Sequence, residues 1–159
     1  MNYWLMKSEP EVVSFEDLLL AKARTTGWEG VRNYQARNFL RDVMKKGDRV
    51  LFYHSNTDEP AVVGIAEVVR EGYVDRTALD PASRYFDEKA KQKGESPWYT
   101  VDVRALMTLS KPVTRAVLQT DRSTQTMMVL RRGARLSVQP VTAAEFEAVC
   151  RLGIASPIR

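Results

Sequence analysis

The sequence has almost none of the side chains that usually hold metals or form disulfides. It contains one cysteine, Cys150, and one histidine, His54, among 159 residues. A single cysteine excludes a disulfide within the chain, and these two ligands are too few for a structural zinc site. Any metal would have to be bound mainly by carboxylates. We therefore expect neither a metal nor a cofactor.

Long apolar runs and the common catalytic motifs are also missing. No stretch approaches the roughly 20 apolar residues that a bilayer-spanning helix needs, and the start of the chain does not resemble a signal peptide. We expect a soluble, cytoplasmic protein that has no membrane partner. The chain has no G-x-S-x-G elbow and no glycine-rich phosphate loop, which weakens the case for an enzyme.

What the chain does contain fits one globular domain. Its length of 159 residues and its apolar content of 44% allow a full hydrophobic core. No linker, internal repeat or low-complexity segment divides it. We expect a single domain over residues 1–153 and a flexible tail over residues 154–159, with a monomer as the default state.

The charge is unevenly distributed, although its sum is only +4. Residues 22–49 carry eight basic and three acidic side chains, and residues 111–135 carry six basic and one acidic. Between them, residues 54–102 carry ten acidic and six basic side chains. Two basic segments separated by an acidic one favour a polarised surface and a polyanionic partner. On charge alone, the solvation of helix surfaces is an equally good explanation.

One stretch, residues 27–38, concentrates side chains suited to nucleic acids. Trp28 stands between two glycines, where the backbone can adopt unusual angles and other groups can approach closely. Asn33 is placed to cap the helix that follows, and Arg32 and Arg37 flank its start. An aromatic plane beside the positive end of a helix suits a stacked base and its phosphate.

Hydrophobic periodicity predicts about six strands and several short helices. Capping boxes at Ser14 with Asp17 and at Thr142 with Glu145 predict a helix near each end of the chain. Gly64 marks a bulge or a close approach of another group. Strands separated by non-repeating helices indicate an α+β domain built on a small mixed β-barrel. The expected strands cover residues 3–7, 49–54, 61–69, 98–105, 106–112 and 135–139, and further helices are expected over 33–44, 83–91 and 115–119.

Six segments, in order along the chain, resemble the EVE domain, a member of the PUA-like superfamily. They are WLMKSEP, GWEGVRNYQARN, LFYHS, VGIAEVV, PWYTVDV and RLSVQPV, and together they span residues 2 to 152. The resemblance implies a PUA-like β-barrel surrounded by short helices, related to YTH domains, which read a methylated adenine in RNA through an aromatic cage. EVE domains are regarded as non-catalytic readers of modified bases. The partner implied is DNA or RNA that carries a methylated or hydroxymethylated base.

The resemblance and the chemistry of the side chains together suggest a base pocket and a set of backbone contacts. Aromatic planes would sandwich a flipped base while amide and hydroxyl groups bond its Watson–Crick edge. The side chains expected in the pocket are Trp28, Trp98, Asn33, Tyr53, His54, Ser8 and Ser55. Those expected to contact phosphates are Lys7, Arg32, Arg37 and Arg122.

Several of these residues also have ordinary structural interpretations. Trp28 can anchor a loop to the core, and Trp98 can belong to the core or its rim because it begins a predicted strand. Asn33 can act only as a helix cap, and His54 can be hydrogen-bonded at a strand end. Arg37 can pair with an acidic neighbour on the surface.

Two other classes of function stay open on sequence grounds. A small enzyme acting on a modified nucleotide could use His54 as general base, oriented by Glu9 or Asp102. Ser8 or Ser55 would then be its nucleophile. A protein-interaction module could instead use the basic faces. The missing catalytic motifs and the resemblance favour a reader of modified bases.

Overall fold

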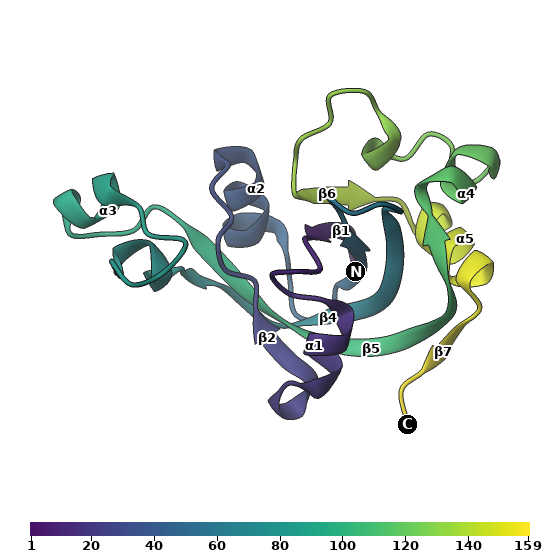
Figure 1. Ribbon diagram of the computed structural model, residues 1–159, viewed down its shortest axis with the longest axis horizontal. Helices are drawn as coiled ribbons and strands as arrows, with labels where there is room; N and C mark the ends of the chain where they lie inside the picture. Colours follow the sequence, from purple (N-terminus) through teal and green to yellow (C-terminus); the bar gives the residue numbers. More distant parts are fainter.

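The computed structural model describes residues 1–159 and has an α+β architecture built on one mixed seven-stranded sheet (Figure 1). The strand order is β2-β5-β4-β3-β1-β6, and β7 pairs with β5. Strands β1 and β3 are parallel, whereas the other pairs are antiparallel. The predicted α+β class is therefore confirmed. The strands are β1 (Tyr3–Ser8), β2 (Thr25–Gly27), β3 (Arg49–His54), β4 (Ala61–Val74), β5 (Tyr99–Thr114), β6 (Val138–Val141) and β7 (Ala155–Pro157).

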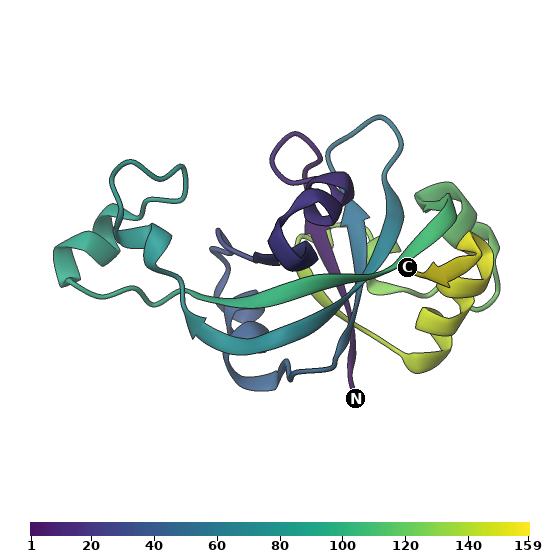
Figure 2. The ribbon, with the colours of Figure 1, turned by 90° about the horizontal axis from the view of Figure 1, so that it is seen from below.

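The sheet is open, in contrast to the barrel that the resemblance implied. Its edge strands β2 and β6 are three and four residues long and do not pair with each other. The pairing of β4 with β5 shifts register at four places, which lets these long strands curve around the core and extend past it (Figure 2). Hydrogen bonding therefore ends at two short edges. The predicted strands over 98–105 and 106–112 are one strand, β5, whereas β2 and β7 were too short to be predicted.

Short helices cover the two faces of the sheet. The capping boxes predicted at Ser14 and Thr142 are both present. The helix predicted over 33–44 is divided into an α-helical and a π-helical part, and the one predicted over 83–91 starts only at Glu88. The α-helices are α1 (Phe15–Leu20), α2 (Tyr34–Asn38), α3 (Glu88–Lys93), α4 (Arg115–Thr120) and α5 (Ala143–Gly153). The π-helix is η2 (Phe39–Val43), and the 3-10 turns are η1 (Lys22–Arg24), η3 (Arg76–Leu79) and η4 (Met128–Leu130).

Two hydrophobic clusters lie on opposite sides of the sheet because neighbouring residues of a strand point to opposite faces. In β1, Trp4 and Met6 belong to the cluster beneath α1 and α2, whereas Leu5 belongs to the cluster beneath α4 and α5. Trp28 is part of the first cluster. Gly64 confirms the predicted close approach, since a Cβ there would lie 2.3 Å from Cζ of Phe15.

Residues 75–98 form an arm that projects from the sheet between β4 and β5 (Figures 1 and 2). The arm carries η3 and α3 and has its own small core of Ala78, Ala90 and Trp98. The arm is therefore a projecting unit that is held together by its own hydrophobic centre.

The C-terminal residues pair with β5 in place of the flexible tail that we expected. Ile154 has a left-handed backbone, with φ of 54°, which redirects the chain along β5. Pro157 lies opposite Met107, and the backbone N–H of Ile158 donates to the carbonyl of Leu106 at 3.2 Å. None of the helices combines the length and the apolar character needed to cross a bilayer.

Candidate nucleic-acid pocket

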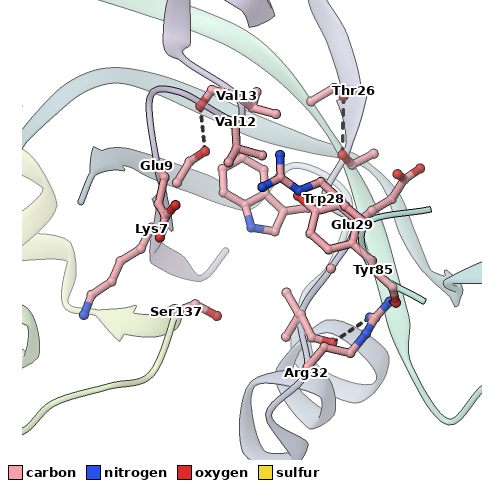
Figure 3. Close-up of a pocket in the computed structure, with 15 residues that line it drawn as sticks. Lys7, Glu9, Val12, Val13, Thr26, Trp28, Glu29, Arg32, Tyr85 and Ser137 are labelled. Atoms are coloured by element: carbon pink, nitrogen blue, oxygen red, sulfur yellow. Dashed lines mark hydrogen bonds between the residues drawn. The ribbon is translucent and has the colours of Figure 1, made fainter. Parts of the chain in front are cut away.

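A cavity of about 350 Å³ opens beside Trp28. Its walls come from the segment after β1, the loop after β2, the arm and the residue before β6. Figure 3 shows Trp28 at the centre, with Tyr85 and Arg32 on one side and Lys7 and Ser137 across the opening. This volume lies at the small end of the range of about 300–1,000 Å³ that is usual for ligand pockets.

Trp28 forms the inner wall of this cavity. Its backbone N–H donates to the carbonyl of Val101 at 2.8 Å, which fixes the loop after β2 on the sheet. Its ring packs edge-on against Phe52, with ring centroids 5.2 Å apart, and only 8% of the residue is exposed. Trp28 is therefore a core anchor, as the structural interpretation of the sequence has it, and also a wall of the cavity.

Tyr85 is the second aromatic side chain of the pocket, and it is not among the residues predicted from the sequence. Its ring lies against Gly30, where an added Cβ would be 2.4 Å from Cε1 of Tyr85. Gly30 also has a φ of +89°, so both its space and its backbone angle require glycine. The sequence signal was present but weak, because Tyr85 lies in a turn-rich segment without periodicity.

Arg32 joins the Trp28 loop to the arm. Its Nη1 donates to Oδ2 of Asp75 at 3.0 Å and to the Val31 carbonyl at 3.0 Å. Its Nη2 donates to the Tyr85 carbonyl at 2.7 Å and to the hydroxyl of Thr77 at 3.3 Å. Four of its five N–H groups are thus used inside the protein. The guanidinium that we expected on a phosphate instead holds the pocket wall in place.

Asp75 is the buried acceptor of this clamp, with 1% of the residue exposed. Besides Arg32, it accepts from the Gly30 backbone N–H at 2.9 Å and from both the N–H and the hydroxyl of Thr77. Burial raises the pKa of Asp75, but these hydrogen bonds outweigh burial and hold it below the ordinary aspartate value. The carboxylate is therefore ionised at neutral pH and bonds to both the loop and the arm.

The opposite wall carries Lys7, Ser8 and Ser137. The Ser8 hydroxyl donates to the Val13 carbonyl at 2.6 Å, and the Lys7 ammonium donates to the Ala134 carbonyl at 3.2 Å. Burial lowers the pKa of Lys7, with a further contribution from the Arg115 charge. The predicted positions of Lys7 and Ser8 beside the pocket agree with this geometry, whereas Ser137 was not anticipated.

Trp98 does not line the cavity. It lies in the core of the arm, 5% exposed, and its indole N–H donates to Oδ2 of Asp87 at 2.8 Å. One ring face is close to Tyr34, with centroids 4.7 Å apart. The structure thus supports the structural interpretation of Trp98, and Tyr85 occupies the place in the pocket that was expected for it.

Four other predicted pocket residues lie outside the cavity lining, namely Asn33, Tyr53, His54 and Ser55. Asn33 accepts from the Ala36 N–H at 3.0 Å, as a helix cap, and Tyr53 is buried in the cluster beneath α4 and α5. Ser55 donates its backbone N–H to the Ser8 carbonyl at 3.0 Å. Sequence proximity to the pocket did not show which way these side chains point.

His54 is engaged at the start of α1. Its Nε2 accepts from the backbone N–H of Phe15 at 3.2 Å. Burial lowers the pKa of His54, and the Asp17 charge opposes this effect. Asp102, considered as its orienting carboxylate, instead accepts from the hydroxyl of Tyr73 at 2.5 Å. Ser8 lies opposite His54 in the pairing of β1 with β3, but its hydroxyl donates to the Val13 carbonyl and no hydrogen bond joins the two side chains.

Of the four expected cations, Lys7 and Arg32 line the cavity. Arg37 donates to the Pro97 carbonyl at 2.7 Å, and Arg122 is exposed on the turn after α4 and does not line the cavity. Arg84 lines the cavity, is exposed and has no hydrogen-bond or ion-pair partner; it lies over the Tyr85 ring at 5.7 Å. Three further exposed arginines occupy the loop that leads to Ser137, namely Arg131, Arg132 and Arg135.

Glu29 and Glu9 are the two carboxylates of the lining. Burial raises the pKa of Glu29, as do the neighbouring charges of Asp75 and Asp102, while Arg32 lowers it. No group of three or more histidine, cysteine, aspartate or glutamate side chains is placed to hold a metal ion. The pocket offers hydrogen-bonding and stacking groups.

The structure thus places an aromatic cavity between the glycine-flanked Trp28 and the arm, on an open α+β sheet. The EVE domain family model matches residues 2–152. The chain therefore belongs to the EVE domain family, as the sequence segments suggested.

Similar proteins share both the sequence and the fold. Thymocyte nuclear protein 1 of Danio rerio is 41% identical, with 98% of this chain and 73% of that protein covered. A hypothetical protein from Leishmania major has a solved structure with a TM-score of 0.89 and 48% identity, covering 97% of this chain and 95% of that one.

One similar structure contains a ligand. It is the human THYN1 protein in complex with DNA that contains 5-methylcytosine. Its TM-score to this chain is 0.86 at 37% identity, and the match covers 99% of this chain and 100% of that one.

Proposed function

We propose that this protein binds DNA and recognises 5-methylcytosine that is turned out of the strand into the cavity beside Trp28. The observation that carries the proposal is this aromatic cavity, placed in a chain with the fold of the THYN1 protein that was solved with 5-methylcytosine DNA. A base inside a duplex is inaccessible to such a pocket, so it must be flipped out to be read.

The walls of the cavity match the parts of a methylated pyrimidine. Tyr85 offers a plane for stacking, which contributes about 1–3 kcal/mol per base. Val12 and Val13 lie beside Trp28 and provide an apolar surface for a methyl group (Figure 3). Burial of one methyl group contributes only about 0.8 kcal/mol, so the preference for the methylated base depends on close enclosure.

The DNA backbone is held by cations around the opening. Lys7 and Arg84 line the cavity, and the loop that carries Arg131, Arg132 and Arg135 continues from it through the hydrogen bond of Lys7 to Ala134. Arg122, which the sequence suggested, lies on the turn after α4 and would extend this path. These contacts give an affinity that falls with salt and is shared by all sequences.

The domain acts in this proposal as a reader without catalysis. His54 uses its Nε2 as an acceptor for Phe15 and does not line the cavity, and the serine hydroxyl that does line it on that side, Ser8, donates to the Val13 carbonyl. The Ser8 hydroxyl is therefore not paired with His54 or with the lining carboxylates of Glu9 and Glu29, as an activated nucleophile would be. Incubation of modified oligonucleotides with the protein should leave them chemically unchanged.

A binding panel at fixed salt tests the function. It contains DNA and RNA single strands and duplexes, each plain or carrying one 5-methylcytosine, 5-hydroxymethylcytosine or methylated adenine. We expect the tightest binding to DNA with 5-methylcytosine, and Trp28→Ala should remove this preference. Equal affinity of the wild type for modified and plain strands would overturn the proposal. Binding that ignores Trp28→Ala but responds to charge reversal would indicate a protein-interaction or generic basic surface.

A further inference from the structure

The three tryptophans of the chain differ in what their indole N–H groups contact. Nε1 of Trp4 donates to Oδ2 of Asp48 at 3.0 Å, and Nε1 of Trp98 donates to Oδ2 of Asp87 at 2.8 Å. Nε1 of Trp28 has no hydrogen-bond partner within the protein. No fully buried side-chain nitrogen or oxygen lacks a partner, so this nitrogen is accessible from outside the protein. The N–H of Trp28 therefore opens onto the cavity.

The orientation of Trp28 supports the same conclusion. The ring is more than nine-tenths buried and packs against Phe52 in the cluster beneath α1 and α2, so little of its face is free for stacking. In Figure 3 the ring nitrogen is directed into the open space in front of Lys7 and Ser137. A buried tryptophan normally finds a partner for its N–H group, so an unpaired one in a pocket points to a ligand acceptor.

We propose that Trp28 reads the base with its edge: its indole N–H donates to the adjacent N3 and O2 acceptors of a cytosine. The inference rests on the proposed function and specifies how the pocket selects its base. Lys7 and Ser137 supply further donors on the facing wall, since the ammonium of Lys7 uses one of its three protons on Ala134. The cavity thus offers donors on both walls to the acceptors of a base.

This contact would separate 5-methylcytosine from thymine. Both bases carry the same methyl group and stack in the same way, so apolar enclosure cannot distinguish them. They differ on the Watson–Crick edge, where cytosine has an acceptor at N3 and thymine has an N–H donor. An N–H of Trp28 facing N3 would bond the first and oppose the second, and such a mismatch of buried polar groups is a strong basis for discrimination.

The tryptophan indole resonances of the wild-type protein give a direct test. In a ¹H–¹⁵N spectrum the three indole groups give three cross-peaks, which Trp28→Phe and Trp98→Phe assign. On addition of a DNA single strand with one 5-methylcytosine, we expect the Trp28 indole proton to move downfield and to exchange more slowly with water. The peaks of Trp4 and Trp98 should stay in place, because their bonds to Asp48 and Asp87 already exist. A bound complex in which the Trp28 peak does not move overturns the inference.

The variant Trp28→Phe provides the second test, because it keeps an aromatic ring and removes the donor. Single strands with 5-methylcytosine, cytosine or thymine at one position avoid differences in base pairing. We expect the variant to bind the 5-methylcytosine strand about fivefold more weakly, the effect of one neutral hydrogen bond, and to lose preference over thymine. Unchanged preference over thymine, with a native melting curve, contradicts the edge contact. A wild type with no preference for 5-methylcytosine over cytosine would refute the proposed function itself.

Discussion

The Trp28 loop and the arm around Trp98 each bury a tryptophan, but they use it differently. The two residues are 8% and 5% exposed. Trp98 packs with Ala78 and Ala90, its N–H is bonded to Asp87, and its ring lies close to Tyr34 of α2, so its contacts are all within the protein. Trp28 packs one part of its ring in the main core and leaves its N–H open to a cavity.

Burial alone therefore does not distinguish the two tryptophans. The hydrogen-bond partner of the indole N–H does, because buried polar groups of a folded protein are normally paired within it. The arm has its own role in the pocket, since it carries Tyr85 to Gly30 and is held there by Asp75 and Arg32. The arm therefore supports the pocket and also contributes Tyr85 to its wall.

Replacing Asp75 with Asn is the strongest way to break the connection between the two regions. Asp75→Asn removes the charge paired with Arg32, whose side chain is 25% exposed while that of Asp75 is fully buried. We expect a loss of about 2–3 kcal/mol in the free energy of unfolding. This value lies at or below the low end of the range for breaking a fully buried ion pair, because Arg32 is partly exposed. Chemical denaturation measures it. Asp80→Asn, at an exposed turn, is the control and should change stability by less than about 0.5 kcal/mol.

The pH dependence of the same variant sharpens this prediction. The folded-state pKa of Asp75 lies below its unfolded value of about 3.9. Its contribution to stability is therefore complete above pH 4 and is lost as the pH falls through the folded-state pKa. The difference in the free energy of unfolding between the wild type and Asp75→Asn should thus become smaller as the pH falls below about 4. A difference between wild type and variant that stays constant down to pH 2.5 would argue against an ionised, clamped carboxylate.

A matched pair of substitutions compares the tryptophans directly. Trp98→Phe and Trp28→Phe remove the same volume, but only the first also breaks a hydrogen bond, to Asp87. We expect Trp98→Phe to lower the free energy of unfolding by about 1 kcal/mol more than Trp28→Phe does. Binding should show the reverse order, with the preference for 5-methylcytosine over thymine lost only in Trp28→Phe. Equal effects of the two variants in both assays would remove the distinction between the regions.

Much of the fold could be predicted because its signals are local. The capping boxes at Ser14 and Thr142, the apolar strands and the close approach at Gly64 all follow from neighbouring residues. The open edges of the sheet and the pairing of β7 depend on contacts between distant segments, which periodicity does not report. The same limit explains why two adjacent predicted strands are one strand, β5.

The site was predictable only in part, for a related reason. Lys7 and Ser8 end strand β1 and Trp28 follows strand β2, so their positions at the pocket follow from short local segments. Tyr85 and Ser137 reach it from far along the chain, so no local pattern marks them. Composition likewise could not show that Arg32 has a buried partner or that Trp98 faces Asp87. Each of these assignments depends on which distant group receives the hydrogen bond.

Arg84 and Arg32 both line the cavity, but only Arg84 has no hydrogen-bond or ion-pair partner within the protein. We therefore expect Arg84 to contribute to DNA binding and not to the stability of the pocket. We expect Arg84→Ala to weaken binding to modified and plain DNA equally. The slope of log affinity against log salt should decrease by about 0.7–0.9, the contribution of one phosphate contact. Arg122→Ala is the comparison, and an equal decrease would extend the backbone path to the turn after α4. An unchanged slope in Arg84→Ala would show that this guanidinium does not contact phosphate.

The smallest expected effect concerns His54, which lies outside the pocket and accepts from the N–H of Phe15. Its folded-state pKa is lowered by burial, so the unfolded state binds the proton more readily, near pH 6.5. The stability that His54 contributes is complete above that pH and decreases as the pH falls below it. His54→Gln keeps an acceptor that does not titrate, so its melting temperature should depend less on pH between 7.5 and 5. Because His54 does not touch the cavity, the preference for 5-methylcytosine should be unchanged. A lost preference would place His54 in the site after all, and identical pH profiles would show that folding does not lower the pKa of His54.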